Sequence, residues 1–133
     1  AKLEIFEDEL DRRSDVGNRY INQISARCPN LSVQKIRQGS TSVFAQFVLL
    51  SESREHYLDA LKAASIPTAV HYPVPLHKQP AYRGKGGSYP KGELANSEIV
   101  ANKVFSIPMD AYLEEEEQDK VISVLETVIN LDV

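Results

Sequence analysis

The sequence predicts an α/β (α+β) fold, a two-layer sandwich in which helices flank a small mixed sheet. Segments with helical and with strand periodicity alternate along the chain, in the order helix, strand, strand, helix, strand, long loop, helix, strand, helix. The 133 residues suit one domain and can bury enough surface for an ordinary core. The sequence contains no internal repeat and no low-complexity tract.

The first predicted element is an amphipathic helix, with charged side chains along one side. The apolar stripe on its other side consists of Leu3, Phe6, Leu10, Tyr20 and Ile24. Arg13 and Gly17 interrupt this stripe. The helix should end near Cys28 and Pro29, because proline keeps the residue before it out of the helical region.

Two strand candidates precede the second helix. Residues 33–37 form the first. Residues 43–50 predict a central strand covered on both faces, because their side chains are apolar on both faces except at Gln46. Ser51 or Ser53 can cap the helix that follows. The apolar stripe of this helix consists of Tyr57, Leu58, Leu61 and Ala64.

The last part of the chain predicts a glycine-rich loop, a weak helix, a short strand and a strong helix. They occupy residues 83–92, 94–103, 104–107 and 113–129. The buried stripe of the last helix should consist of Val121, Ile122, Leu125, Val128 and Ile129. A phosphate cradle is the functional alternative for the loop, but no strand directly precedes its glycines and no helix directly follows them. Residues 114–117 are acidic and should favour the helix dipole rather than bind a metal.

Composition and charge argue against several classes of protein. The net charge of −4 and the pI near 5.4 argue against nucleic-acid binding, which needs a basic face. No apolar run approaches the ~20 residues of a membrane span. The start of the chain lacks a signal-peptide layout, so the expected location is the cytoplasm. Cys28, the single cysteine, should be a small, semi-buried apolar group rather than a nucleophile.

The strongest candidate for a functional site is residues 66–82, IPTAVHYPVPLHKQPAY. A strand over residues 68–72 should lead into a loop that four prolines hold nearly rigid. A rigid loop can aim side chains at a ligand with little ordering cost. The candidate substrate-binding side chains are His71, Tyr72, His77 and Gln79. In the structural alternative, the histidine at the strand end bonds a backbone carbonyl and the tyrosine packs on the neighbouring proline.

Four blocks of the sequence carry a family resemblance. In chain order they read AKLEIFEDELDRR, SVFAQFVLL, HYPVPLHKQPA and VFSIPMDAYLEEEEQDKVISVLETVI. They resemble, in the same order, the DegT/StrS family of pyridoxal-phosphate-dependent nucleotide-sugar aminotransferases. Within that family the chain looks most like the enzymes that aminate UDP-2-acetamido-2-deoxy-3-oxo-glucuronate for lipopolysaccharide or O-antigen synthesis.

The resemblance implies that residues 1–133 are the small C-terminal domain of a fold type I enzyme that works as a homodimer. Such an enzyme transfers an amino group from glutamate to the keto carbon of a UDP-sugar. His71 and Tyr72 align with a His-Tyr pair that, in similar enzymes, lies near the sugar nucleotide at the active-site mouth. Asp110 and Ala111 replace a His-Pro pair common in the family, so no role of that histidine carries over to this chain.

Members of the family keep the lysine that binds pyridoxal phosphate, and the acidic partner of the pyridinium nitrogen, in a large upstream domain. The chain starts without methionine inside a predicted helix, so we expect it to be a fragment that lacks this domain. We expect no catalytic, cofactor-binding or metal-binding residue in it, no bound pyridoxal phosphate and no activity of the fragment alone. Two interpretations compete: a free-standing module that binds a small ligand through the same loop, and a purely structural or oligomerisation domain.

Overall fold

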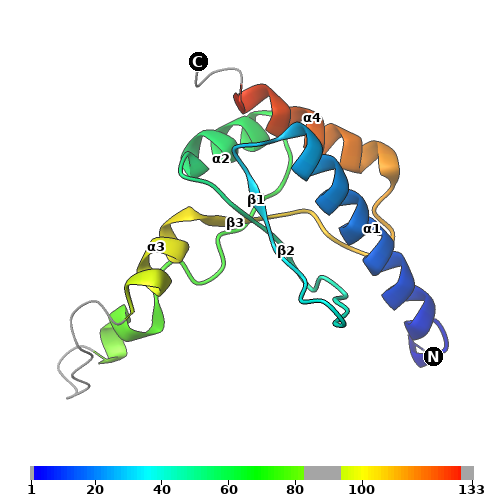
Figure 1. The fold of residues 1–133 in the computed structure, drawn as a ribbon, viewed down its shortest axis with the longest axis horizontal. Helices are drawn as coiled ribbons and strands as arrows, with labels where there is room; N and C mark the ends of the chain where they lie inside the picture. Colours follow the sequence, from blue (N-terminus) through cyan, green and yellow to red (C-terminus); the bar gives the residue numbers. More distant parts are fainter. Residues whose placement is uncertain (1, 83–93, 130–133) are drawn as a thin grey trace.

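The computed structural model describes residues 2–82 and 94–129. Its helices and strands are α1 (Phe6–Arg27), β1 (Ser32–Val33), β2 (Phe47–Leu50), α2 (Arg54–Ala63), α3 (Ala95–Lys103), β3 (Val104–Ile107) and α4 (Glu115–Ile129). The short 3-10 turns are η1 (Lys2–Glu4), η2 (Leu76–Lys78) and η3 (Pro80–Tyr82). Helix α4 packs against both α1 and α2, and these three helices form one layer over the sheet (Figure 1). Residues 72–82 and 95–103 project from this body, and we call them the arm.

The sheet has the strand order β1-β2-β3, and both of its pairings are antiparallel. The predicted two-layer class is confirmed, and β2 is the central strand as predicted. The expectation of a mixed sheet is wrong for the described residues. Residues 68–72, which were expected to add a strand, contribute only one bridge between Ala69 and Ser106, and this bridge is antiparallel too.

The hydrophobic core lies between the helix layer and one face of the sheet. Strand alternation places Phe47, Leu49, Phe105 and Ile107 on this face, each at most 4% exposed. The predicted stripes of α2 and α4 supply the other side of the core. Their buried members are Tyr57, Leu61, Val121, Ile122, Leu125 and Val128. Each large apolar side chain that is fully buried contributes about 1.5–3 kcal/mol, so this core holds the two layers together.

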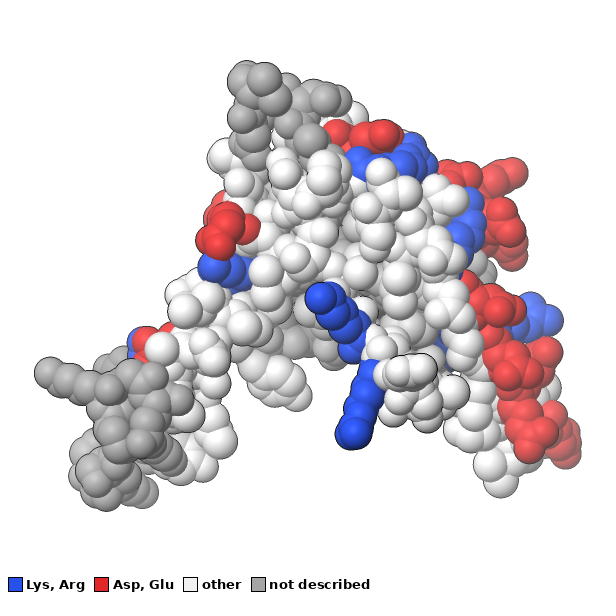
Figure 2. Space-filling model, in the orientation of Figure 1, with Lys and Arg blue, Asp and Glu red and all other residues white. Residues whose placement is uncertain are grey.

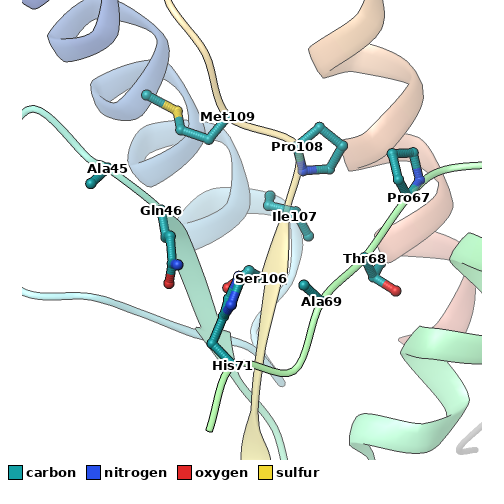
Figure 3. Close-up of a pocket in the computed structure, with 10 residues that line it drawn as sticks. All are labelled: Ala45, Gln46, Pro67, Thr68, Ala69, His71, Ser106, Ile107, Pro108 and Met109. Atoms are coloured by element: carbon teal, nitrogen blue, oxygen red, sulfur yellow. The ribbon is translucent and has the colours of Figure 1, made fainter.

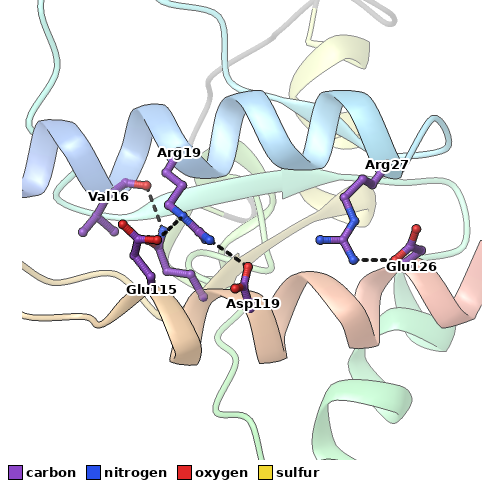
Figure 4. A network of polar contacts seen from close by, with 7 residues as sticks. Val16, Arg19, Arg27, Glu115, Asp119 and Glu126 are labelled. Carbon is purple, nitrogen blue, oxygen red and sulfur yellow. Dashed lines mark hydrogen bonds and ion pairs between the residues drawn. The ribbon is translucent and has the colours of Figure 1, made fainter.

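Polar contacts also join α1 to α4 (Figure 4). Arg19 and Arg27 donate to carboxylates of α4, with Arg27 lying 2.6 Å from Glu126. These pairs are partly exposed, and such pairs contribute about 0–1 kcal/mol each. Gln118 is 1% exposed and donates from its amide to the carbonyl oxygen of Val16 at 3.0 Å. Because a buried amide without a partner is costly, this bond fixes the position of α4 along α1.

Helix α1 ends at Arg27 with Cys28 as its C-cap, as predicted. The start of α1 and the turn η1 before it do not join the core, because Phe6 is 47% exposed and Leu3 is 84% exposed. The buried residues of α1 begin only at Val16, and of the predicted stripe Tyr20 and Ile24 are buried. Acidic side chains gather over the start of α1 and the start of α4, whereas the broad face between α1 and the arm carries few charges (Figure 2).

Cys28 is fully buried, although the sequence predicts a semi-buried side chain. Burial raises the pKa of its thiol to about 11. Glu115, Glu116 and Glu117 form the first turn of α4, and the carboxylate of Glu117 accepts a hydrogen bond from the backbone N–H of Glu114 at 3.1 Å. No helix in the described part of the chain combines the length and the apolar character needed to cross a bilayer.

Residues 43–46 do not belong to β2, although the sequence predicts that they do. Arg13 of α1 donates hydrogen bonds to the carbonyl oxygens of Val43 at 2.9 Å and Phe44 at 2.7 Å. Phe44 has a φ of 45°, in the left-handed region, and its ring lies directly over Gly17 of α1. These contacts turn the backbone away from the extended conformation, so β2 starts later than predicted.

Two turns also differ from expectation. β1 ends at Val33 because the side-chain oxygen of Gln34 accepts the hydrogen bond from the backbone N–H of Val48 at 3.2 Å. The side chain of Gln34 therefore takes the place of a further backbone pairing. α2 begins after Ser53, but this serine makes no side-chain capping bond. Instead, Oγ of Ser51 accepts the backbone N–H of Ser53 at 3.1 Å, which stabilises the turn before the helix.

Gly17→Ala should destabilise the chain. The new Cβ would lie 2.2 Å from Cδ2 of Phe44. Alanine improves helix propensity by up to ~1 kcal/mol, but overpacking costs about 1–3 kcal/mol, so we expect a net loss of about 1–2 kcal/mol. Urea denaturation measures it. The matched control, Asn18→Ala on the exposed side of α1, should change stability by less than ~0.5 kcal/mol. In a Phe44→Ala background the cost of Gly17→Ala should vanish; an unchanged cost would show that the ring contact is not its cause.

Candidate functional site

Two hollows meet at His71. The first has a volume of about 230 Å³ and lies against the side of β3 that points away from the helix layer (Figure 3). We call it the sheet-face hollow, and its lining includes Gln46, Thr68, His71, Ser106, Pro108 and Met109. The second has a volume of about 560 Å³ and lies between the proline-rich loop and α3. We call it the arm hollow, and its lining includes Tyr72, Leu76, Tyr82, Val100, Ala101 and Val104 in addition to His71.

The position of His71 follows from the bridge between Ala69 and Ser106. The two residues exchange backbone hydrogen bonds of 3.2 and 2.7 Å, so their side chains lie on the same face. Ser106 points away from the core, because its neighbours Phe105 and Ile107 point into it. Two residues after Ala69, the side chain of His71 returns to the outer face. It is exposed and lines both hollows.

Tyr72 is held in a strained and exposed conformation. Its φ is 56°, in the left-handed region, and 84% of the residue is exposed. For a residue other than glycine this backbone conformation costs about 1–3 kcal/mol and persists only where the surroundings impose it. The alternative in which Tyr72 packs on its neighbouring proline does not fit this exposure. A strained, exposed phenol at the edge of a hollow is the arrangement expected of a ligand contact.

His77 and Gln79 have partners inside the protein. Nε2 of His77 lies 3.0 Å from a carboxylate oxygen of Glu98 on α3, and Lys78 donates to the other oxygen at 2.6 Å. The amide of Gln79 donates to the carbonyl oxygen of Val74 at 3.0 Å. The structure therefore gives both predicted site residues a role in holding the loop. Their contact with substrate stays a prediction.

Glu98 links the two walls of the arm hollow. Hydrogen bonds from Lys78 and then His77 lower the pKa of Glu98, because both favour the charged carboxylate. Because its pKa is lowered, the carboxylate of Glu98 stays charged at pH values at which an ordinary glutamate begins to take up a proton. On the acidic side, the bridge is lost when the pH falls through the lowered pKa of Glu98 and the carboxylate takes up a proton.

The residues of the site that were not predicted from the sequence include Gln46, Glu98 and Ser106. Gln46 had a visible signal, since it is the one polar residue in an apolar run. Ser106 reaches the site through its pairing with Ala69, and Glu98 reaches it from a helix that looks unremarkable in sequence. No local pattern marks either of them.

The two hollows at His71 lack the groups that hold pyridoxal phosphate. This cofactor needs a lysine amine for covalent attachment and an acidic partner for its ring nitrogen. Among the described residues, those that line the two hollows include neither a lysine nor an acidic residue. The two hollows fit the recognition of a ligand rather than the attachment of the cofactor.

The predicted glycine-rich loop, residues 83–92, lies outside the described residues.

Asp110 and Ala111 belong to the segment that leads into α4. The carboxylate of Asp110 accepts the backbone N–H of Tyr112 at 2.7 Å, and Ala111 is 8% exposed. Neither lines the two hollows at His71.

The small α/β sandwich is similar in fold to part of solved aminotransferase structures. Residues 1–126 match the model of the DegT/DnrJ/EryC1/StrS aminotransferase family. The chain belongs to this family.

Similar proteins include enzymes and solved structures. The chain is 40% identical over 116 residues to the UDP-2-acetamido-2-deoxy-3-oxo-D-glucuronate aminotransferase of Pseudomonas aeruginosa. The aligned region covers 85% of this chain and 30% of that protein. A DegT DnrJ EryC1 StrS aminotransferase from Brucella abortus is 36% identical with a TM-score of 0.85, covering 95% of this chain and 32% of that one. S. venezuelae DesV, solved in complex with a ketimine intermediate, is 28% identical with a TM-score of 0.85, covering 95% and 33%. The chain spans about a third of the length of these relatives.

Removing either partner of Glu98 should raise its pKa. Lys78→Ala should raise it more than His77→Ala, because the bond from Lys78 is the larger cause of the lowered value. The shift can be followed by ¹³C NMR of the Glu98 carboxyl group during an acid titration of the chain. Lys62→Ala on α2, outside the arm, is the control and should leave the titration unchanged. Equal titration curves for all variants would show that the bridge is absent in solution.

Proposed function

We propose that this chain is the small C-terminal domain of a pyridoxal-phosphate-dependent aminotransferase that acts on a nucleotide-linked keto sugar. The carrying observation is the corner at His71 and Tyr72. It lies between two hollows and presents an imidazole and a phenol for which the described residues supply no hydrogen-bond partner. Family membership gives this corner its chemical context.

The finer proposal concerns the substrate. The 40% identity to the enzyme from P. aeruginosa supports UDP-2-acetamido-2-deoxy-3-oxo-glucuronate as acceptor, with glutamate as amino donor, in lipopolysaccharide or O-antigen synthesis. In this proposal the complete enzyme is a cytoplasmic homodimer. The exposed Leu3 of η1 and Phe6 of α1 then pack on a large domain that carries the cofactor lysine.

The side chains of this chain would serve recognition. His71 can donate to a phosphate or a uronate carboxylate, and Tyr72 adds a neutral donor. His77 and Gln79 keep the loop in place and are the second candidates for substrate contact. The cofactor, when bound by the complete enzyme, acts as the electron sink of the amino transfer. The rigid loop positions the sugar nucleotide before that reaction, so the entropy of ordering is small.

In the complete enzyme, His71→Ala should lower kcat/KM for the UDP-linked keto sugar by about 10- to 100-fold, because a hydrogen bond to a charged group is lost. Release of 2-oxoglutarate from glutamate measures the reaction. His56→Ala, which removes an exposed histidine of α2 outside both hollows, is the matched control and should keep full activity. Unchanged kcat/KM in His71→Ala and Tyr72→Phe would favour a purely structural role for the corner.

The chain alone should show no transaminase activity, and no visible absorbance of bound cofactor should survive desalting after incubation with pyridoxal phosphate. The physical reason is that the described residues lining the two hollows include no lysine. A visible spectrum before and after desalting is the measurement. Retained absorbance would contradict the proposal that the cofactor lysine lies outside this chain. A complete gene product without transaminase activity would favour the free-standing binding module.

A further inference from the structure

We propose that the sheet-face hollow binds the acetamido group of an N-acetylated sugar, and that Gln46 is the residue that recognises its amide. This inference rests on the proposed function and deepens it by assigning a residue to substrate choice. The polar side chains that line the hollow include Gln46, His71 and Ser106, which come from three separate segments of the chain (Figure 3).

Strand geometry brings these side chains to one face. Val48 of β2 pairs with Ser106 of β3, so both point away from the core. Gln46 lies in the bend directly before β2, and its side chain lines the hollow on this face (Figure 3). His71 reaches it through the bridge at Ala69. The hollow is thus bounded by three segments whose relative positions are fixed by backbone pairing.

The side chain of Gln46 differs from three other glutamines of the chain. Gln34, Gln79 and Gln118 each bond a backbone group. Gln46 is exposed, and no partner for its amide occurs among the described residues. An amide has a donor and an acceptor side by side, so it can satisfy both polar groups of another amide at once.

The rest of the lining distinguishes an acetamido group from other parts of a nucleotide sugar. Within the described residues, the hollow is lined by no lysine, arginine, aspartate or glutamate, so a carboxylate or diphosphate would find no lysine or arginine to pair with. Pro108 and Met109 supply apolar surface beside the polar groups. A planar amide with a methyl group matches this combination. The volume of about 230 Å³ also admits part of the sugar ring.

The first test measures binding to this chain, without catalysis. UDP-N-acetylglucosamine and UDP-glucose, which differ only in the acetamido group, are titrated separately while the side-chain amide of Gln46 and the methyl group of Met109 are followed by NMR. We expect UDP-N-acetylglucosamine to shift both signals and to bind about 3- to 10-fold more tightly, the worth of one or two hydrogen bonds. Equal affinities, or no shift at either group, would overturn the proposal.

The variant Gln46→Leu removes the amide at similar size. It should abolish the preference for UDP-N-acetylglucosamine and leave the affinity for UDP-glucose unchanged. Gln38→Leu, an exposed glutamine outside the hollow, is the matched control and should keep the preference. Equal weakening of both ligands by a Gln46→Leu variant whose NMR spectrum shows the native fold would overturn the proposal.

In the complete enzyme, Gln46→Leu should raise KM for the acetamido substrate about 3- to 10-fold with little change in kcat. The two hypotheses fail separately. An active sugar aminotransferase whose KM is unaffected by Gln46→Leu overturns this inference alone. Acetamido-selective binding by the chain of an inactive gene product overturns the proposed function and keeps the binding site.

Discussion

The contact between Phe44 and Gly17 is the constraint on which the geometry of the site depends. Only a residue without a side chain at position 17 lets the ring approach the backbone of α1 so closely. Arg13 also donates hydrogen bonds to the carbonyl oxygens of Val43 and Phe44. Together, these contacts determine where the backbone becomes extended and β2 begins. A shift of one residue would turn Phe47 outward and Gln46 into the core. The packing of one ring thus determines which side chains face the ligand.

Much of the fold could be predicted because its signals are local. β3 has the predicted limits, and α4 buries the predicted stripe wherever its side chains are described. The strand expected from residue 43 failed for a reason that no local pattern contains. Arg13 lies 30 residues away in the sequence, and its hydrogen bonds to the chain appear only after α1 has packed. The expected fourth strand failed similarly, since residues 68–72 make one bridge and then turn.

The prolines in the sequence were enough to locate the candidate site, but the role of each of its side chains could not be predicted. The spacing of prolines marks a rigid loop, and His71 and Tyr72 lie where that loop meets both hollows. The left-handed backbone of Tyr72 has no sequence signal, because tyrosine rarely adopts it. The direction of a side chain cannot be predicted from the sequence of such a loop either. Gln79 bonds its own loop and Gln46 points outward, although the two residues have the same chemistry.

The burial of Cys28 has a practical consequence for the chemistry of this protein. A thiol reacts as its thiolate, and a pKa of about 11 leaves only about one molecule in 10⁴ ionised at pH 7. Oxidants and alkylating reagents should therefore react slowly with Cys28 in the native state. Labelling of this thiol then reports local or global unfolding. Disulfide-linked dimers that form during storage would reflect such unfolding and not a native interface.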